Sequence, residues 1–208
     1  MQQQHQISIS KETLNSLPVA KFRGEIAVIS SPDEIEEAIE ELRKHPIVVF
    51  DTESRPSVKK GENHSVALLQ ISTDEKCFLF RMNLIGLGEQ ITKYLEDESI
   101  TKIGLSLNDD FLNLRKINPD LNPGGFIDLQ NYVKDFGIID NSLTKIYGVL
   151  FGKRISKGQR LTNWEAQTLT RSQQDYAALD AQSCLDIYEY LRAGNFDPMQ
   201  SPYLQKAE

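Results

Sequence analysis

The hydrophobic and polar positions along the chain follow two periods, which predicts strands and helices in turn. Residues 46–50 (PIVVF) are almost continuously apolar, as is typical of a strand buried on both faces. Two further apolar runs, 66–72 (VALLQIS) and 76–80 (KCFLF), surround the turn residues 73–75 and predict a pair of neighbouring strands. Shorter strands are expected at 25–30, 101–105 and 124–129.

Helical periodicity fills the stretches between these strands. Residues 30–45 begin with two serines that can cap a helix, and they carry one apolar stripe made of Ile35, Ala38, Ile39 and Leu42. Further helices are expected at 87–97, 107–117, 128–137, 142–152 with Gly152 as its stop, and about 171–191. Because strands alternate with helices, the pattern predicts an α/β domain with a mixed central sheet flanked by helices.

The two ends of the chain lack this periodicity. Of the 208 residues, we expect 25–193 to form a single domain, which is long enough to bury a core. Residues 1–24 are polar and predict an arm or a partly ordered lead-in, and residues 194–208 predict an irregular tail. No secretory signal or apolar run of about 20 residues is visible, so we expect a cytoplasmic protein with no membrane partner.

The chain is acidic, with a net charge of −7 at pH 7. Proteins that bind phosphates usually carry a basic surface, so this charge argues against a passive nucleic-acid binder. It argues less against a metal-dependent nuclease, because carboxylates that hold divalent cations are locally neutralised. The two cysteines, Cys77 and Cys184, show no zinc spacing and are interpreted as small hydrophobic residues.

Two carboxylates follow the first buried strand, in the sequence Phe50-Asp51-Thr52-Glu53. Side chains alternate along a strand, so Asp51 and Glu53 point to the same side. Two such carboxylates beside apolar residues repel each other unless a cation joins them. The alternative is a pair of solvated charges where the strand enters a loop.

A second acidic position, Asp110, follows the strand predicted at 101–105. On a helical wheel of ~100° per residue, Asp110 lies about 60° from Leu107, beside the stripe of Leu107, Phe111 and Leu114. Asp110 can therefore face the same crevice as Asp51, whereas Asp109 points away. The alternative is a first-turn acid that interacts with the helix dipole.

The last predicted helix carries Tyr176 and Asp180, which share a face because they are four residues apart. Small alanines at 177 and 178 allow that face to pack closely; the alternative is a surface Tyr–Asp pair. Four carboxylates and a phenol on regular elements suit phosphodiester hydrolysis with two divalent cations. Hard oxygen ligands favour Mg²⁺ or Mn²⁺, and the phenol can orient the attacking water or help to remove its proton.

At these residues the chain resembles the DEDD (DnaQ-like) 3′–5′ exonucleases, whose fold is ribonuclease H-like. FDTE (50–53), GLSLNDDF (104–111) and YAALD (176–180) are similar to the three motifs of that superfamily, and Tyr176 is similar to the marker of its tyrosine subclass. Within the subclass the chain is most similar to ribonuclease D and Werner-type exonuclease domains, most specifically in residues 160–188. The resemblance covers about residues 25–193.

This resemblance implies a 3′–5′ exonuclease that releases nucleoside monophosphates from single-stranded or recessed 3′ ends. It implies that Asp51, Glu53 and Asp180 hold one cation and that Asp51 and Asp110 hold the second. It supports a contact between the backbone of Thr52 and the terminal nucleotide; the alternative is an ordinary β-branched residue at the end of a strand. The Werner-type likeness favours DNA over RNA. Ser106 departs from the asparagine that proofreading members often carry, which leaves one substrate contact open. We expect neither a helicase domain nor the helical accessory domain of ribonuclease D in these 208 residues, so substrate choice does not follow from either relative.

Further substrate contacts are expected from a basic loop and an aromatic residue. The loop 153–160 carries four cations, with Lys157 and Arg160 nearest the third motif, and can contact phosphates or remain solvated. Trp164 can stack on a base or pack in the core. Two rival functions remain: a catalytically silent nucleic-acid-binding module, which would lack a carboxylate, and a small-molecule phosphatase, which lacks the support of a glycine-rich loop.

Overall fold

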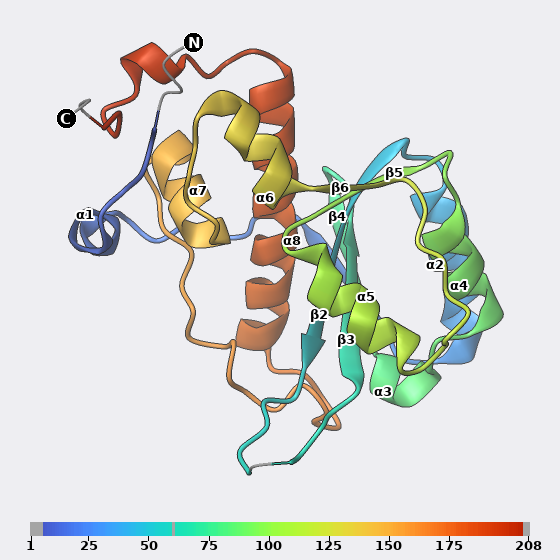
Figure 1. Ribbon diagram of the computed structural model, residues 1–208. Helices are drawn as coiled ribbons and strands as arrows, with labels where there is room; N and C mark the ends of the chain where they lie inside the picture. The colour runs from blue at the N-terminus through green and yellow to red at the C-terminus, as the bar shows by residue number, and fades with distance from the viewer. Residues whose placement is uncertain (1–5, 60, 206–208) are drawn as a thin grey trace.

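A mixed six-stranded sheet forms the centre of the computed structural model, which describes residues 6–59 and 61–205 (Figure 1). The strand order is β1-β4-β3-β2-β5-β6. β3 runs antiparallel to β2 and β4, whereas the pairs β1–β4, β2–β5 and β5–β6 are parallel. The strands are β1 (Glu25–Ile29), β2 (Ile47–Ser54), β3 (Val66–Ser72), β4 (Lys76–Phe80), β5 (Thr101–Gly104) and β6 (Phe126–Asp128). The predicted α/β fold with a mixed sheet is confirmed.

Helices cover both faces of this sheet, so the protein has three layers (Figure 1). One core cluster packs α2 (Ile35–Leu42), α4 (Glu89–Glu96) and α5 (Leu107–Arg115) against the sheet. The other packs α7 (Leu143–Phe151) and α8 (Arg171–Arg192) against the opposite face. β2 alternates between them: Phe50 belongs to the first cluster and Val49 to the second. This explains why its sequence is apolar without a polar face.

The longest helix, α8, crosses the sheet and contacts β2, β3, β4 and β5. Its first turn is closed by a capping box, in which Thr170 and Gln173 each accept a backbone N–H of the other. Three alanines of α8 are completely buried, namely Ala177, Ala178 and Ala181. Because their side chains are small, the helix lies close to the end of β2.

The remaining predicted helices differ from the structure mainly in their first or last turns. In the segment 30–45 a 3-10 helix (Pro32–Glu34) precedes α2, and residues 128–137 form α6 (Leu129–Tyr132) and then a 3-10 helix (Val133–Phe136). α3 (Met82–Ile85) is a short helix that the periodicity did not indicate. Gly152 ends α7 in the left-handed conformation, with φ of 61°, as predicted. Within residues 6–59 and 61–205, no helix is long and apolar enough to cross a membrane.

The expectation of a partly ordered lead-in before residue 25 is wrong for the part that the structure describes. Ile7 and Ile9 are 0% and 1% exposed, and α1 (Lys11–Ser16) places Leu14 against α7. The N–H of Ile7 donates to the carbonyl of Gly137, and Leu204 of the tail pairs with Ile7 from the other side. These partners are far away in the sequence, so periodicity within the segment could not indicate them. Residues 1–5 and 206–208 of the expected arm and tail lie outside the described residues.

Candidate active site

Asp51 and Glu53 project from a part of β2 that has a neighbour on one side only. β2 pairs with β5 as far as Val49, opposite Ile103, and continues alone with β3 through Asp51 and Glu53. Both carboxylates line a cleft of about 430 Å³. The end of the buried strand therefore delivers two half-buried carboxylates to one cavity, as the alternation of side chains predicted.

α8 supplies the opposite wall of this cleft with Tyr176 and Asp180. Asp180 is 8% exposed, whereas Tyr176 is half-buried one turn earlier. The close approach of α8 to β2 brings residues separated by more than a hundred positions into one site. The structure thus unites four of the five residues that the motifs indicated for catalysis: Asp51, Glu53, Tyr176 and Asp180.

The fifth residue, Asp110, joins the site through a hydrogen bond to Thr52. The hydroxyl of Thr52, between the two β2 carboxylates, donates to Oδ1 of Asp110. Asp110 is half-buried and Asp109 is exposed, so the helix phase deduced from the sequence is confirmed. Asp110 does not itself line the cleft, because its carboxylate faces Thr52.

A left-handed residue and two hydrogen bonds to Asp128 fix the start of α5, the helix that carries Asp110. Ser106 has a φ of 65° and is the one non-glycine residue with positive φ among the described residues. Asp128 accepts hydrogen bonds from the N–H groups of Ser106 and Leu107, each 3.1 Å long, and also caps α6. Ser106 does not line the cleft. The structure therefore supports a role for Ser106 in shaping the start of α5 rather than a contact with the substrate.

The pKa values of all four carboxylates are raised in the fold. Burial is the main cause at every position, and it raises the pKa of Asp110 to about 6, of Asp180 to about 7 and of Glu53 to about 8. The pKa of Asp51 lies well above its ordinary value through burial and then through the charges of Asp110, Glu53 and Asp180. A concentration of buried negative charge of this kind favours the binding of cations.

The donor set fits hard divalent cations by its chemistry, since it consists of carboxylate oxygens with no thiolate or imidazole among them. Within the described residues, however, no group of three or more His, Cys, Asp and Glu side chains is already arranged to hold a metal ion. The hydrogen bond between Asp110 and Thr52 is one reason, because it holds this carboxylate away from the cleft.

The four basic side chains of the loop 153–160 have different surroundings. Lys157 and Arg160 line the cleft, and their charges lower the pKa of Asp180 against the effect of burial. Arg154 instead directs its Nε to the carbonyl of Leu17, at 3.2 Å, and Lys153 lines a separate cavity. Of the basic loop, Lys157 and Arg160 are thus placed to meet a substrate in the cleft.

Trp164 lies in the core rather than in the cleft, which corrects its assignment as a substrate-binding residue. Its side chain is 0% exposed, and its ring centroid lies 6.1 Å from that of Tyr176. A fully buried indole offers no face for a nucleic-acid base. Packing, the alternative that the sequence left open, is what the structure shows, and Trp164 supports the ring of Tyr176 from behind.

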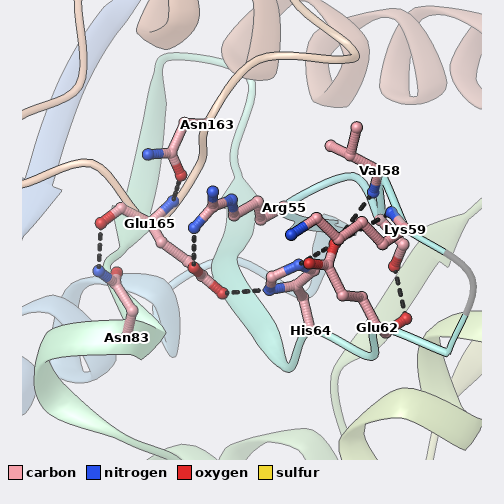
Figure 2. A network of polar contacts seen from close by, with 9 residues as sticks. Arg55, Val58, Lys59, Glu62, His64, Asn83, Asn163 and Glu165 are labelled. Carbon is pink, nitrogen blue, oxygen red and sulfur yellow. Dashed lines mark hydrogen bonds and ion pairs between the residues drawn. The ribbon is translucent and has the colours of Figure 1, made fainter.

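Sequence reasoning missed a polar network that fastens the loop after β2 to the segment that carries Arg160 (Figure 2). The carboxylate of Glu165 contacts Nδ1 of His64 at 3.1 Å and an Nη atom of Arg55 at 3.4 Å. The side chain of Asn83 donates to the carbonyl of Glu165, and the N–H of Glu165 donates to Asn163 (Figure 2). No spacing in the sequence signals this network, because His64 and Glu165 are 101 positions apart.

The sequence also did not indicate that the start of α7 forms part of the cleft wall. The start of α7 lines it with Ser142, Leu143 and Thr144. Thr144 is tied to the neighbouring segment, since its Oγ1 accepts the N–H of Ile155 at 3.0 Å. These small polar and apolar residues carry no charge pattern that would distinguish them in the sequence from an ordinary helix start.

Comparisons with known proteins agree with this geometry. The mouse bifunctional 3′–5′ exonuclease/ATP-dependent helicase WRN is 31% identical over an alignment of 205 residues that covers 93% of this chain and 14% of that protein. A 3′–5′ exonuclease of Arabidopsis thaliana is 27% identical, over 88% of this chain and 69% of its own length. The chain thus spans a minor part of the mouse protein and about two thirds of the plant protein.

The crystal structure of the Aedes aegypti Nibbler EXO domain superimposes with a TM-score of 0.75 at 21% identity, covering 88% of this chain and 97% of that domain. At that identity the likeness shows the fold alone, which is the ribonuclease H-like fold expected from the motifs. The family model described as 3′–5′ exonuclease matches residues 26–194, which include every carboxylate of the cleft and Asp110. The chain belongs to this 3′–5′ exonuclease family.

Proposed function

We propose that the protein removes nucleoside monophosphates from the 3′ end of a nucleic acid with the help of two divalent cations, Mg²⁺ or Mn²⁺. The observation that carries this proposal is the convergence of Asp51, Glu53, Asp180 and Tyr176 on one cleft, with Asp110 bonded to the residue between the first two. Members of this family typically depend on divalent cations, and the cations would supply Lewis-acid stabilisation of the oxygens that enter and leave the phosphorus.

Different residues around the scissile phosphate would bind the cations, orient the attacking water and contact the substrate. Asp51, Glu53 and Asp180 would hold one cation and Asp51 with Asp110 the other, which neutralises the buried negative charge. The phenol of Tyr176 presents an O–H to the cleft, where it would orient the attacking water. Lys157 and Arg160 meet the phosphates from the opposite side, and Thr52 contacts the terminal nucleotide.

DNA is the substrate that we favour, on the likeness to the exonuclease part of WRN over most of the chain. RNA is the second candidate, because structural neighbours include an Escherichia coli RNase D described as an exoribonuclease and a Trypanosoma brucei RNase D in complex with RNA U12. Both candidates place the same chemistry at the same cleft. The catalytically silent binding module is disfavoured because every carboxylate of the motifs is present.

The decisive experiment is the degradation of matched DNA and RNA strands that carry a label at the 3′ or the 5′ end, in Mg²⁺ or Mn²⁺. We expect loss of the 3′ label as mononucleotide in the first turnover and a ladder from the 5′-labelled strand. Full activity in excess chelator, or products that arise only by attack from the 5′ end, would overturn the proposal. Rapid loss of DNA with slow loss of RNA supports the favoured substrate, and the reverse order selects RNA.

A further inference from the structure

A second groove, which we call the Lys11 groove, opens beside the active-site cleft. It has a volume of about 390 Å³ and lies between α1, the start of α7 and the segment 154–157. The two cavities adjoin, because they share the wall residues Ser142, Thr144, Ile155 and Lys157. A strand whose 3′ end occupies the cleft can therefore leave it through the Lys11 groove.

The Lys11 groove is basic although the chain as a whole is acidic. Lys11, Lys145, Arg154 and Lys157 line it, and no Asp or Glu is among its lining residues. Lys145 is paired with Asp140 at 2.6 Å. The other three cations form no ion pair with any residue in 6–59 or 61–205. Unpaired cations along one groove create a positive potential that attracts an anionic polymer.

The groove has a fixed shape, because the segment that contains α1 is anchored to the domain. The buried carboxylate of Asp140 accepts the N–H of Ile9 at 2.9 Å and the hydroxyl of Ser8 at 3.1 Å. Leu14 packs so closely on Gly148 of α7 that a Cβ there would lie 2.8 Å from it. Lys11 and Asn15 consequently stand on a rigid wall rather than on a loose arm.

We propose that the Lys11 groove binds the sugar–phosphate backbone of the substrate strand on the 5′ side of its terminal nucleotide. This inference rests on the proposed nuclease function and adds the path of the substrate to it. The buried side chains of Leu14 and Ile155 form an apolar floor for the sugars, while Lys11, Arg154 and Lys157 meet the phosphates. The family model matches residues 26–194, so the wall formed by α1 lies outside the matched residues.

Charge reversal at Lys11 tests the groove, since this side chain is exposed and forms no ion pair with any residue that the structure describes. The substrates are a dinucleotide, which reaches only the cleft, and a single strand of about 12 nucleotides, a length within the usual range of strand-binding sites. For Lys11→Glu we expect kcat/KM on the longer strand to fall about 5- to 10-fold. The slope of log K for binding against log salt concentration should decrease in magnitude by about 1, as expected for the loss of one phosphate contact. The dinucleotide should be cleaved at the wild-type rate.

Two further variants sharpen the result. Lys44→Glu makes the same charge change at an exposed lysine after α2, far from the groove, and should leave both substrates unaffected. Asn15→Lys adds a cation to the same wall and should increase the affinity for the longer strand. Affinity is also measured by fluorescence anisotropy in Ca²⁺, so that binding is read independently of turnover.

If Lys11→Glu and the wild type bind and degrade the longer strand equally well, the groove does not hold the substrate, and the proposed function stands. If the wild type cleaves neither substrate, the proposed nuclease function fails, and the anisotropy measurement still decides the groove. Equal losses on the dinucleotide and the longer strand also overturn the inference, because they would place Lys11 at the cleft itself.

Discussion

The hydroxyl of Thr52 donates a hydrogen bond to Oδ1 of Asp110, which lies 58 positions further along the chain. This bond joins the second motif of the exonuclease site to the first, because Thr52 stands between Asp51 and Glu53. It also lowers the pKa of Asp110 against the effect of burial. Since binding of a cation by Asp110 competes with this bond, Thr52 and Asp110 form the part of the site that we expect to rearrange when cations bind.

The adjacent acids Asp109 and Asp110 should respond differently to the same substitution. Asp110→Asn removes a charge from the proposed site and should reduce the rate at saturating Mg²⁺ by at least about 100-fold, or ~2.7 kcal/mol in the barrier. Asp109→Asn changes an exposed side chain, so activity should be retained and stability should stay within about 0.5 kcal/mol. An inactive Asp109 variant beside an active Asp110 variant would contradict this placement of the second motif.

The distinction between these two acids shows what local sequence patterns can predict. Leu107 and Leu114 are buried, so the helix phase was correct, and the alternating side chains of β2 likewise placed Asp51 and Glu53 together. In a strand or helix with one buried face, the spacing of the apolar residues along the sequence indicates which side chains point to the core. The three motifs and the mixed sheet could therefore be predicted from the chain alone.

Contacts between distant segments could not be predicted in the same way. Ile7 and Ile9 are buried because Gly137, Asp140 and Leu204 provide partners, and no period within residues 1–24 encodes those partners. Trp164 fits either a core or a stacking site by its type, and its burial is decided by α8 passing over it. The same reason explains why the contact of His64 with Glu165 was not foreseen.

Asp51→Asn should abolish turnover and leave the fold intact. Asp51 is the expected ligand of both cations, and its pKa lies far above the ordinary value because of burial and three neighbouring carboxylates. Removal of its charge relieves repulsion, so the metal-free variant should unfold at a higher temperature than the wild type. Retention of more than about a tenth of the wild-type rate, a loss of only ~1.4 kcal/mol, would show that Asp51 is not a bridging ligand.

The stability of the metal-free protein should fall as the pH rises from about 4 to 8. In the unfolded chain aspartate and glutamate titrate near pH 4, whereas in the fold burial raises the pKa of Asp110 to about 6, of Asp180 to about 7 and of Glu53 to about 8. The folded state therefore binds more protons than the unfolded state in this range, and its advantage is lost as these groups ionise.

Thermal melts in chelator across this range measure the effect, which should reach a few kcal/mol because one unit of pKa corresponds to about 1.4 kcal/mol. Glu53→Gln should flatten the curve, since it removes the carboxyl group whose pKa is raised to about 8. Saturating Mg²⁺ should also flatten it by neutralising the ionised carboxylates. A melting temperature that rises steadily from pH 4 to 8 in chelator would contradict the buried cluster.

Tyr176→Phe should slow hydrolysis by about 100-fold, within the range of general acid–base effects, without loss of metal binding. The phenol lines the cleft, whereas the ring packs against Trp164 with centroids 6.1 Å apart. Phenylalanine keeps that ring and removes only the hydroxyl. Calorimetric titration with Mn²⁺ should give the wild-type stoichiometry, and the disappearance of one site would show that the phenol binds a cation.

Glu165→Gln should weaken substrate binding by loosening the segment that carries Arg160. The substitution removes the charge that faces His64 and Arg55 but leaves the backbone contacts with Asn83 and Asn163 in place. The cost in global stability should be small, about 0–1 kcal/mol, because the ion pairs are partly exposed. Amide hydrogen exchange should accelerate in residues 160–167, and KM for an oligonucleotide should rise several-fold while kcat changes little.

A matched control separates this effect from the mere loss of a surface charge. Glu89→Gln removes the charge of the exposed pair with Lys93 on α4, whose Nζ–Oε1 distance is 2.6 Å and which has no residue in common with the Glu165 network. This control should leave exchange in residues 160–167 and KM unchanged. If the two variants behave alike, the network around Glu165 does not position Arg160. We expect Glu165→Gln to raise KM and Glu89→Gln to leave it unchanged. If the double variant Glu165→Gln/His64→Gln has the same KM as Glu165→Gln, the two side chains act through their mutual contact, which joins the loop after β2 to the cleft.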